Sequence, residues 1–156
     1  MYMHLFNMSQ LQLPDLPCLC GSFRRTARAL TQLYEEALRP LQLTATQLTI
    51  LQVLWRAGEV SQRQLGEILA MDSTTLTRTL RIMRRHAWVA GCKGQDRRER
   101  RLRLAKGGRT QLQRATPVWE RLQSRLRRRI GAEEWKRLLL VTDQIAKIAG
   151  SKGEQS

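Results

Sequence analysis

Residues 93–104 are rich in basic side chains: they include five arginines and one lysine but only two carboxylates. A guanidinium offers five N–H donors in a planar fork that matches the paired oxygens of a phosphate or a carboxylate. From Arg101 to Leu104 polar and apolar residues alternate, which predicts a half-buried strand with its arginines facing outward. This stretch therefore favours a hairpin that presents positive charge to an anion.

The charge imbalance extends through the whole chain. Its 156 residues carry 28 basic and 13 acidic side chains, a net charge of +15, and only five of the basic residues are lysines. Residues 72–109 hold twelve basic and three acidic side chains, so this quarter of the chain alone carries +9. Such a concentration indicates nucleic-acid binding. Binding to an anionic membrane would need a broad apolar helix face that no core uses, and here the apolar positions fit a core.

Length and composition fit one folded domain with a core of its own. The chain is 42% hydrophobic and 26% charged, as in ordinary folded proteins. No apolar run approaches the roughly 18 residues that a membrane span requires. The amino end lacks the basic start and long apolar stretch of a signal peptide, so we expect a cytoplasmic protein.

Catalytic and cofactor chemistry find little support. The chain has two histidines, no carboxylate pair, no nucleophile beside a base, and no glycine-rich phosphate loop. Cys18 and Cys20 lie closer in sequence than the usual spacing of zinc ligands. We therefore expect no enzyme, no metal site and no cofactor. The alternative function is RNA binding, but modules for RNA stack bases on exposed aromatics, and aromatic residues make up only 5% of this chain.

Helix signals precede the basic hairpin. Apolar residues at three- and four-residue steps predict a helix over residues 19–38, ended by Pro40, and another over residues 46–55, ended by Gly58. The inward side of the second helix is expected to hold Leu48, Leu51, Leu54 and Trp55.

Two shorter helices follow. Ser61 with Gln64 forms a capping-box pattern that begins the first, and Asp72 or Ser73 caps the second. The inward residues are expected to be Leu65, Ile68 and Leu69 in the first helix and Leu76, Leu80 and Met83 in the second.

The C-terminal part begins with a strand near Val89, the basic turn and the returning strand. Residues 106–148 are then helical, with a break at Gly131 and a bend expected at Pro117, which lacks a backbone donor. Apolar stripes on these terminal helices favour a homodimer over an intrachain helical pair, because an open apolar face must find a partner. The stripes are Leu112, Ala115, Trp119, Leu122, Leu126 and Ile130, and Leu138, Val141, Ile145 and Ile148.

Two short helices followed by a basic hairpin predict a winged helix-turn-helix, a mainly α-helical fold with a small β-hairpin wing. We expect this domain over residues 41–105. Residues 18–40 and 106–150 would form a helical dimerisation region from both chain ends, with a flexible extension at 1–17 and a disordered tail at 151–156. A twofold dimer would place two reading helices about 34 Å apart on a palindromic operator in double-stranded DNA.

The predicted DNA contacts come from the start of the first short helix, the outward face of the second, and the wing. Hydroxyls and guanidinium forks on the second helix can reach base edges, although Thr74 and Thr75 taken singly fit a plain surface role equally well. In the wing, the tip arginines can enter the minor groove and those of the returning strand suit phosphates. The contacts are Ser61, Gln62, Arg63, Ser73, Thr74, Thr75, Thr77, Arg78, Arg81, Arg97, Arg98, Arg101 and Arg103.

From residue 41 to residue 108 this order of motifs resembles the MarR family of bacterial transcription regulators. The matching pieces are LTATQLTILQVL, SQRQLGEILAMDSTTLTRTLRIMRRHAWV and DRRERRLRLAKGG. In the family's wing signature, Asp-x-Arg-Asp-x-Arg, the positions are taken by Asp96, Arg98, Glu99 and Arg101, with glutamate replacing the second aspartate.

The helix after the wing departs from the family at its start, because Ala105 replaces the usual threonine cap, while Gly108 matches. The weaker likeness of the flanking helices extends the resemblance over nearly the whole chain. It implies an obligate homodimer that binds palindromic operator DNA and usually represses until an effector arrives.

Cys18 and Cys20 lie at the start of the first helix, where the helix dipole stabilises a thiolate. Their spacing resembles the peroxide-sensing OhrR branch of the family, with Cys20 at the reactive cysteine and Tyr34 at one tyrosine partner. Ala45 stands where that branch has its second tyrosine. Three alternatives stay open: oxidation of Cys20 with a bridge to Cys18 or to a partner chain, a small apolar or phenolic ligand between the dimer helices and the winged domain, or no effector.

Overall fold

The structure is a computed structural model that describes residues 18–93 and 100–150. The chain divides into two compact units between Leu33 and Tyr34. The first unit contains most of helix α1 (Leu19–Leu38), and the second contains the end of α1 and everything that follows. The predictions that fall outside the described residues concern the extension at 1–17, the tail at 151–156, and the wing-tip residues Arg97 and Arg98.

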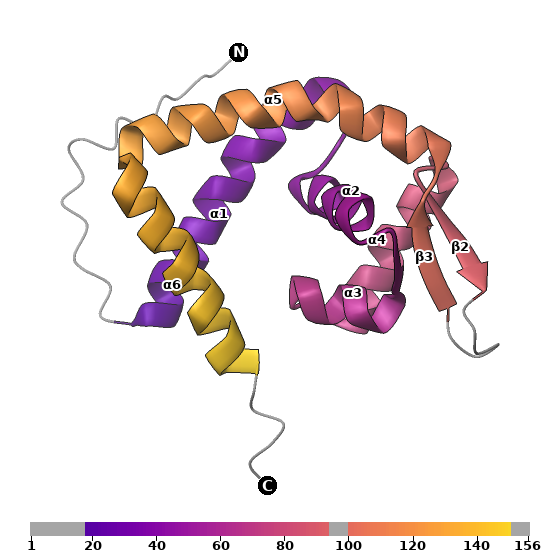
Figure 1. Ribbon diagram of the computed structural model, residues 1–156, viewed down its shortest axis with the longest axis horizontal. Helices are drawn as coiled ribbons and strands as arrows, with labels where there is room; N and C mark the ends of the chain where they lie inside the picture. The colour runs from indigo at the N-terminus through magenta and orange to yellow at the C-terminus, as the bar shows by residue number, and fades with distance from the viewer. Residues whose placement is uncertain (1–17, 94–99, 151–156) are drawn as a thin grey trace, which may run out of the picture. The chain divides into compact units, whose positions relative to one another are not determined.

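The second unit holds the helix-turn-helix, the wing and two C-terminal helices (Figure 1). Helix α1 ends in the single turn η1 (Arg39–Leu41), which contains Pro40, as predicted. The elements that follow are α2 (Ala45–Ala57), β1 (Glu59–Ser61), α3 (Gln62–Leu69), α4 (Ser73–Arg85), β2 (Val89–Lys93), β3 (Arg100–Leu104), α5 (Lys106–Ile130) and α6 (Ala132–Gly150).

Side-chain caps fix where the short helices begin. The predicted capping box is confirmed: the Ser61 hydroxyl accepts from the Gln64 amide at 3.1 Å, and the Gln64 side chain accepts from the Ser61 amide at 2.9 Å. Thr44 and Gln47 form the same box at the start of α2. Asp72 is the cap of α4. These caps satisfy amide donors that the first turn of a helix leaves without a backbone partner.

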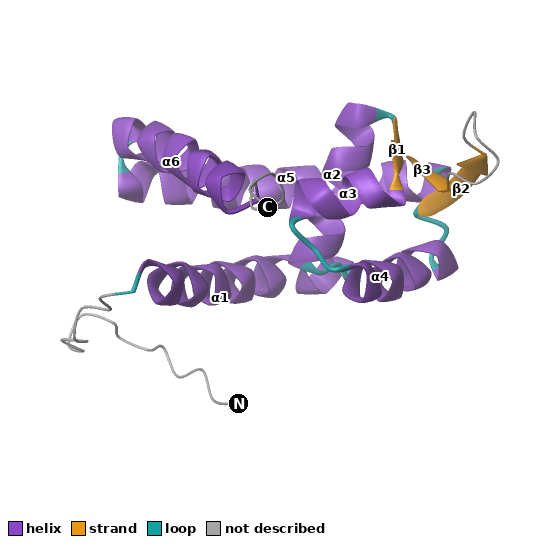
Figure 2. Ribbon diagram, turned by 90° about the horizontal axis from the view of Figure 1, so that it is seen from below, coloured by secondary structure: helices purple, strands orange, loops and turns teal. Residues whose placement is uncertain are grey.

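The wing is a three-stranded antiparallel sheet rather than a hairpin alone, with β3 between β1 and β2 (Figure 2). Val60 lies opposite Leu102 on one side, and Gly91 lies opposite Leu102 on the other. The predicted alternation on β3 is confirmed, because Leu102 and Leu104 are buried while Arg103 is exposed. Strand β1 was not predicted, since three residues between Gly58 and a helix cap are too few to show a period.

The core lies among α2, α3, α4, the sheet and the first half of α5. The expected inward residues of α4 are confirmed, but two others are wrong: Trp55 is 60% exposed and Ile68 is 57% exposed. Trp55 lies on the buried side of α2 but in its last turn, and Ile68 lies about 110° from the inward side of α3. The core residues are Leu38, Leu43, Leu48, Ile50, Leu51, Leu54, Val60, Leu65, Leu76, Leu80, Met83, Trp88, Val89, Leu102, Leu104, Leu112 and Ala115.

Helix α6 is open along its length, with none of its described residues buried. Its exposed apolar side chains include Leu138, Leu139, Leu140, Val141 and Ile148. Within residues 18–93 and 100–150, no helix combines the length and apolar character that crossing a membrane requires.

The start of α5 is held close to the connection between α4 and β2. Ala105 precedes α5 without a side-chain cap, and its amide donates instead to the carbonyl oxygen of Trp88 at 3.0 Å. A Cβ at position 107 would lie 2.6 Å from the carbonyl oxygen of Ala87, and one at position 108 would lie 2.1 Å from that of Trp88. Only glycine at these two positions allows so close an approach of backbone to backbone. Helix α5 then continues through Pro117 as one curved helix in Figure 1.

We predict that Gly108→Ala lowers the free energy of unfolding by at least about 1–3 kcal/mol, because the new methyl group overlaps the Trp88 carbonyl and the backbone must shift. Chemical denaturation measures this loss. Gly21→Ala is the matched control, since the nearest atom to its Cβ would be 3.8 Å away. Alanine in a helix interior should leave stability unchanged or raise it by up to about 1 kcal/mol. Equal effects of the two substitutions would contradict the close approach at Gly108.

Candidate nucleic-acid interface

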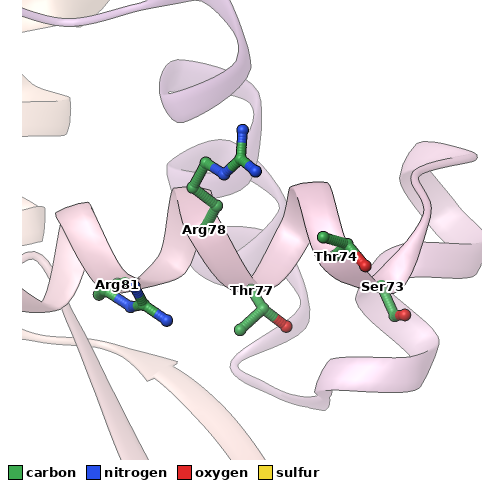
Figure 3. A pocket seen from close by; sticks show the side chains of 5 residues that line it. All are labelled: Ser73, Thr74, Thr77, Arg78 and Arg81. Atoms are coloured by element: carbon green, nitrogen blue, oxygen red, sulfur yellow. The ribbon is translucent and has the colours of Figure 1, made fainter.

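Helix α4 has one packed side and one open side. Leu76, Leu80 and Met83 are at most 2% exposed. On the open side, five polar side chains project from α4 around a groove of about 350 Å³ (Figure 3). They are Ser73, Thr74, Thr77, Arg78 and Arg81, five of the six residues that the sequence places outward on this helix.

The sixth residue, Thr75, is part of the cap. Its amide donates to Asp72 Oδ1 at 2.9 Å, and its hydroxyl donates to Asp72 Oδ2 at 2.6 Å. These hydrogen bonds hold the pKa of the Asp72 carboxyl below its ordinary value. Thr75 therefore fixes the first turn of α4, whereas Ser73 and Thr74 just before it are exposed and can meet a ligand.

The predicted contacts on α3 are engaged within the protein. Ser61 is buried, and its hydroxyl serves the capping box. The side-chain Nε2 of Gln62 donates to the Thr77 hydroxyl at 2.9 Å, and this hydrogen bond holds α3 against the open side of α4. Arg63 is exposed and pairs with Glu67 at 2.9 Å, a hydrogen bond that raises the pKa of Arg63. To contact DNA, Ser61 would have to break its hydrogen bond in the capping box. Arg63 would only have to exchange its exposed ion pair with Glu67 for a contact with DNA.

Two of the predicted wing contacts, Arg101 and Arg103, lie within the described residues, and they differ in exposure. Arg101 and Arg103 lie on the same face of β3, because their positions differ by two residues. Arg101 is half-buried, and its guanidinium donates to the carbonyl oxygen of Glu59 at 3.2 Å. Arg103 is exposed, so it is the better placed of the two for an outside anion.

The predicted thiol site is only partly assembled within one chain. Cys18 and Cys20 are exposed and carry free thiols. The hydroxyl of Tyr34 accepts a hydrogen bond from the side chain of Gln123, and burial raises the pKa of Tyr34. Along α1, Cys20 and Tyr34 are fourteen residues apart, a rise of about 21 Å, so the two do not meet in one chain.

A second cavity occupies the region where a small ligand was expected, between the C-terminal helices and the winged domain, but its lining residues were not predicted. It has a volume of about 510 Å³ and lies between α2 and α5. Two indole rings and two guanidinium groups are among its walls, and the signal that could have revealed it is the tryptophan-arginine pair at the end of α2. The lining residues are Gln52, Trp55, Arg56, Arg109, Leu112, Gln113, Thr116 and Trp119.

Known proteins share this arrangement. The family model described as the MarR family matches residues 43–99. A crystal structure of the M. tuberculosis transcriptional regulator MosR in complex with DNA is 36% identical to this chain. The similarity covers 85% of this chain and 96% of the MosR chain, with a TM-score of 0.76. This chain belongs to the MarR family.

Two further comparisons fit this assignment. Wild-type MarR from E. coli in its apo form has a TM-score of 0.68 over 84% of this chain and 98% of its own, and at 23% identity it shows the fold alone. An uncharacterized HTH-type transcriptional regulator, YwoH of Bacillus subtilis (strain 168), is 28% identical over 88 residues, or 56% of this chain. The chain spans 64% of the length of that curated relative.

The cap of α4 gives a pH-dependent prediction. Because hydrogen bonding lowers the pKa of Asp72 in the folded state, its contribution to stability is present above the unfolded pKa and is lost as the pH falls through the folded one. Asp72→Ala should therefore be less stable than the wild type at pH 7, and the difference should shrink in acid. Asp72→Asn keeps a hydrogen-bond acceptor that does not titrate, so its stability should lack this pH-dependent contribution. Thermal unfolding from pH 7 to pH 2 checks this, and a pH-independent gap between wild type and Asp72→Ala would contradict it.

Proposed function

We propose that this transcriptional regulator binds double-stranded DNA with sequence preference, reading bases with α4 and holding phosphates with the wing. The observation that carries the proposal is the open side of α4, where hydroxyls and guanidinium groups surround one groove while the other side is buried. The major groove is about 12 Å wide and admits one helix, so these side chains can reach base edges. The DNA complex of MosR supports the same role for this chain.

RNA binding is not favoured. The groove on α4 is lined by serine, threonine and arginine, and no aromatic ring lies among its lining residues for bases to stack on. In the major groove of a duplex, arginine side chains bind guanine and serine or threonine hydroxyls bind the edges of several bases. These are the residue types that line the groove on α4.

Arg78 is the sharpest test of base reading. We predict that Arg78→Ala costs about 1–3 kcal/mol in binding to the preferred duplex and little in binding to random duplexes, because a bidentate contact to a base is lost. Arg84→Ala removes the same charge from the same helix outside the groove, and it should weaken both duplexes to a small and equal extent. Binding titrations with a selected and a random duplex measure this. If Arg78→Ala weakens both duplexes equally, Arg78 is a phosphate contact and does not read bases.

The dimer is part of the proposal. Helix α6 exposes apolar side chains along its whole length, and such a surface requires a partner in water. We therefore expect the particle in solution to have twice the chain mass of 18.1 kDa. Light scattering at micromolar concentration measures it. A stable monomer would contradict both the dimer and the palindromic operator that follows from it.

Repression and its release are the finer part of the proposal. We propose that a small phenolic or other aromatic anion enters the cavity between α2 and α5 and releases the DNA. Trp55 and Trp119 offer ring faces, and Arg56 and Arg109 offer charge for an oxyanion. Because α5 begins directly after the wing, a ligand wedged between α2 and α5 would act on the part of the chain that carries β3.

Thiol oxidation is the competing route of release. Peroxide would convert the Cys20 thiolate to a sulfenic acid, and a second thiol would displace water from it to form a disulfide. Cys18 and Cys20 are exposed. Burial and the nearby Glu59 carboxylate raise the pKa of the Cys92 thiol, so Cys92 is a poorer nucleophile.

One experiment separates the two routes. DNA release is measured for the wild type, Trp55→Ala and Cys20→Ser, with a series of phenolic acids and separately with mild peroxide. For the cavity route, we expect Trp55→Ala to need about tenfold more phenolic ligand, since an aromatic contact worth about 1.4 kcal/mol is lost. Cys20→Ser should respond as the wild type does. If peroxide releases the wild type but not Cys20→Ser, and no phenolic acid releases either, the cavity route is wrong.

A further inference from the structure

Helix α5 carries a line of arginines, from its middle to its C-terminal end, that none of the roles above uses. Arg114, Arg121, Arg125 and Arg128 follow one another at steps of seven, four and three residues, and all four are exposed. At about 100° per residue these steps place the four side chains within an arc of about 60° around the helix. We call this surface the arginine stripe.

The stripe has no neutralising partners in the described chain. Among those residues, the ion pairs are Arg63–Glu67, Lys136–Glu133 and Lys147–Asp143, and none involves the stripe. Between positions 114 and 129 the single carboxylate is Glu120, about 110° away from the stripe around the helix. Glu120 lies at the edge of an open groove of about 520 Å³, whose other lining residues are Pro117, Arg121, Ser124 and Arg128.

Stabilisation of the helix explains Arg128, which lies in the last turn of α5, but not the rest of the stripe. Cations near a helix C-terminus interact favourably with its dipole, but the effect falls off within the last turn. Arg114 and Arg121 lie more than two turns before the end of α5 at Ile130. Packing of α5 within the chain does not explain them either, because the apolar side of α5, with Leu112, Ala115 and Leu122 buried, lies about 135° around the helix from the arginines.

We infer that the arginine stripe binds the phosphate backbone of a second segment of duplex DNA, without reading its sequence. The stripe spans fourteen residues, or about 21 Å, and one strand of a duplex presents a phosphate for every 3.4 Å of axis, so about six phosphates face it. From Arg109 onward every basic residue of α5 is arginine, the side chain whose fork matches phosphate oxygens. The Ser124 hydroxyl in the same groove adds a neutral donor.

The stripe lies away from the elements that read the first duplex. Helix α5 starts beside the wing, and Arg121 to Arg128 lie about 22 to 33 Å along it from Lys106. Figure 1 shows α5 leading from β3 to α6, with α3 and α4 near its wing end. The inference of a second segment rests on the proposed function, in which the first segment occupies α4 and the wing. One protein would then hold two DNA segments together.

The test is a two-duplex capture with the full-length protein. A biotinylated duplex of about three helical turns is immobilised and saturated with protein, and a fluorescent duplex of unrelated sequence is then added. The wild type should retain the second duplex. The triple variant R121Q/R125Q/R128Q should retain about tenfold less, and its binding of the second duplex should lose about 2.7 from the slope against log salt, since each phosphate contact contributes about 0.9.

The matched control is R24Q/R25Q/R28Q, which removes three exposed charges from α1 instead. It should retain the second duplex as the wild type does, and both variants should bind the first duplex within about twofold of the wild type. If the wild type binds the first duplex but never the second, the stripe inference is overturned while the proposed function stands. Equal loss in the control, or a monomeric triple variant, also overturns it. Failure of the wild type to bind the first duplex overturns both.

Discussion

The rotation of α4 about its own axis is the constraint on which the rest of the interface depends. Leu76, Leu80 and Met83 are at most 2% exposed, and burying each is worth about 1.5–3 kcal/mol. A rotation of α4 about its axis by one residue, about 100°, would expose these side chains and bring arginine toward the core. The same burial that stabilises the domain therefore decides which side chains lie on the open side of α4.

Polar contacts then fix the ends and the neighbours of α4. Asp72 and Thr75 define its first turn, and the hydrogen bond from Gln62 to Thr77 ties α3 to its open side. At the other end, Gly107 and Gly108 let the start of α5 approach the backbone of Ala87 and Trp88. Because these contacts lie on both ends of α4, the helix is joined to the wing and to α5 through a short stretch of chain. A ligand between α2 and α5 could use that connection to move the wing.

Much of this could be predicted from the sequence, because the signals are local. The period of α4, the box at Ser61 and Gln64, and the alternation on β3 depend on neighbouring residues alone, and each is confirmed. The errors arise where tertiary packing decides. Strand β1 forms because β3 is there to pair with it. Trp55 fits the inward period of α2 yet is exposed in its last turn, and Ile68, three residues after Leu65, lies outside the buried side of α3.

The candidate site shows the same division. The outward set on α4 follows from helix period, so five of its six members line one groove. The sixth, Thr75, donates its hydroxyl to the capping residue Asp72. Helix period alone does not predict which side chain a hydroxyl will bind. The α2–α5 cavity joins residues about sixty positions apart, and nothing in either segment by itself predicts that they meet.

Hydroxyl-radical footprinting on the DNA that flanks the protein's own gene tests the central claim most directly. A twofold dimer that reads the major groove with α4 should protect two segments related by a dyad. Their centres should lie about 10 base pairs, one helical turn, apart. The wings should protect sugars outside each half-site. A single protected segment without symmetry, or uniform protection along the duplex, would contradict the account.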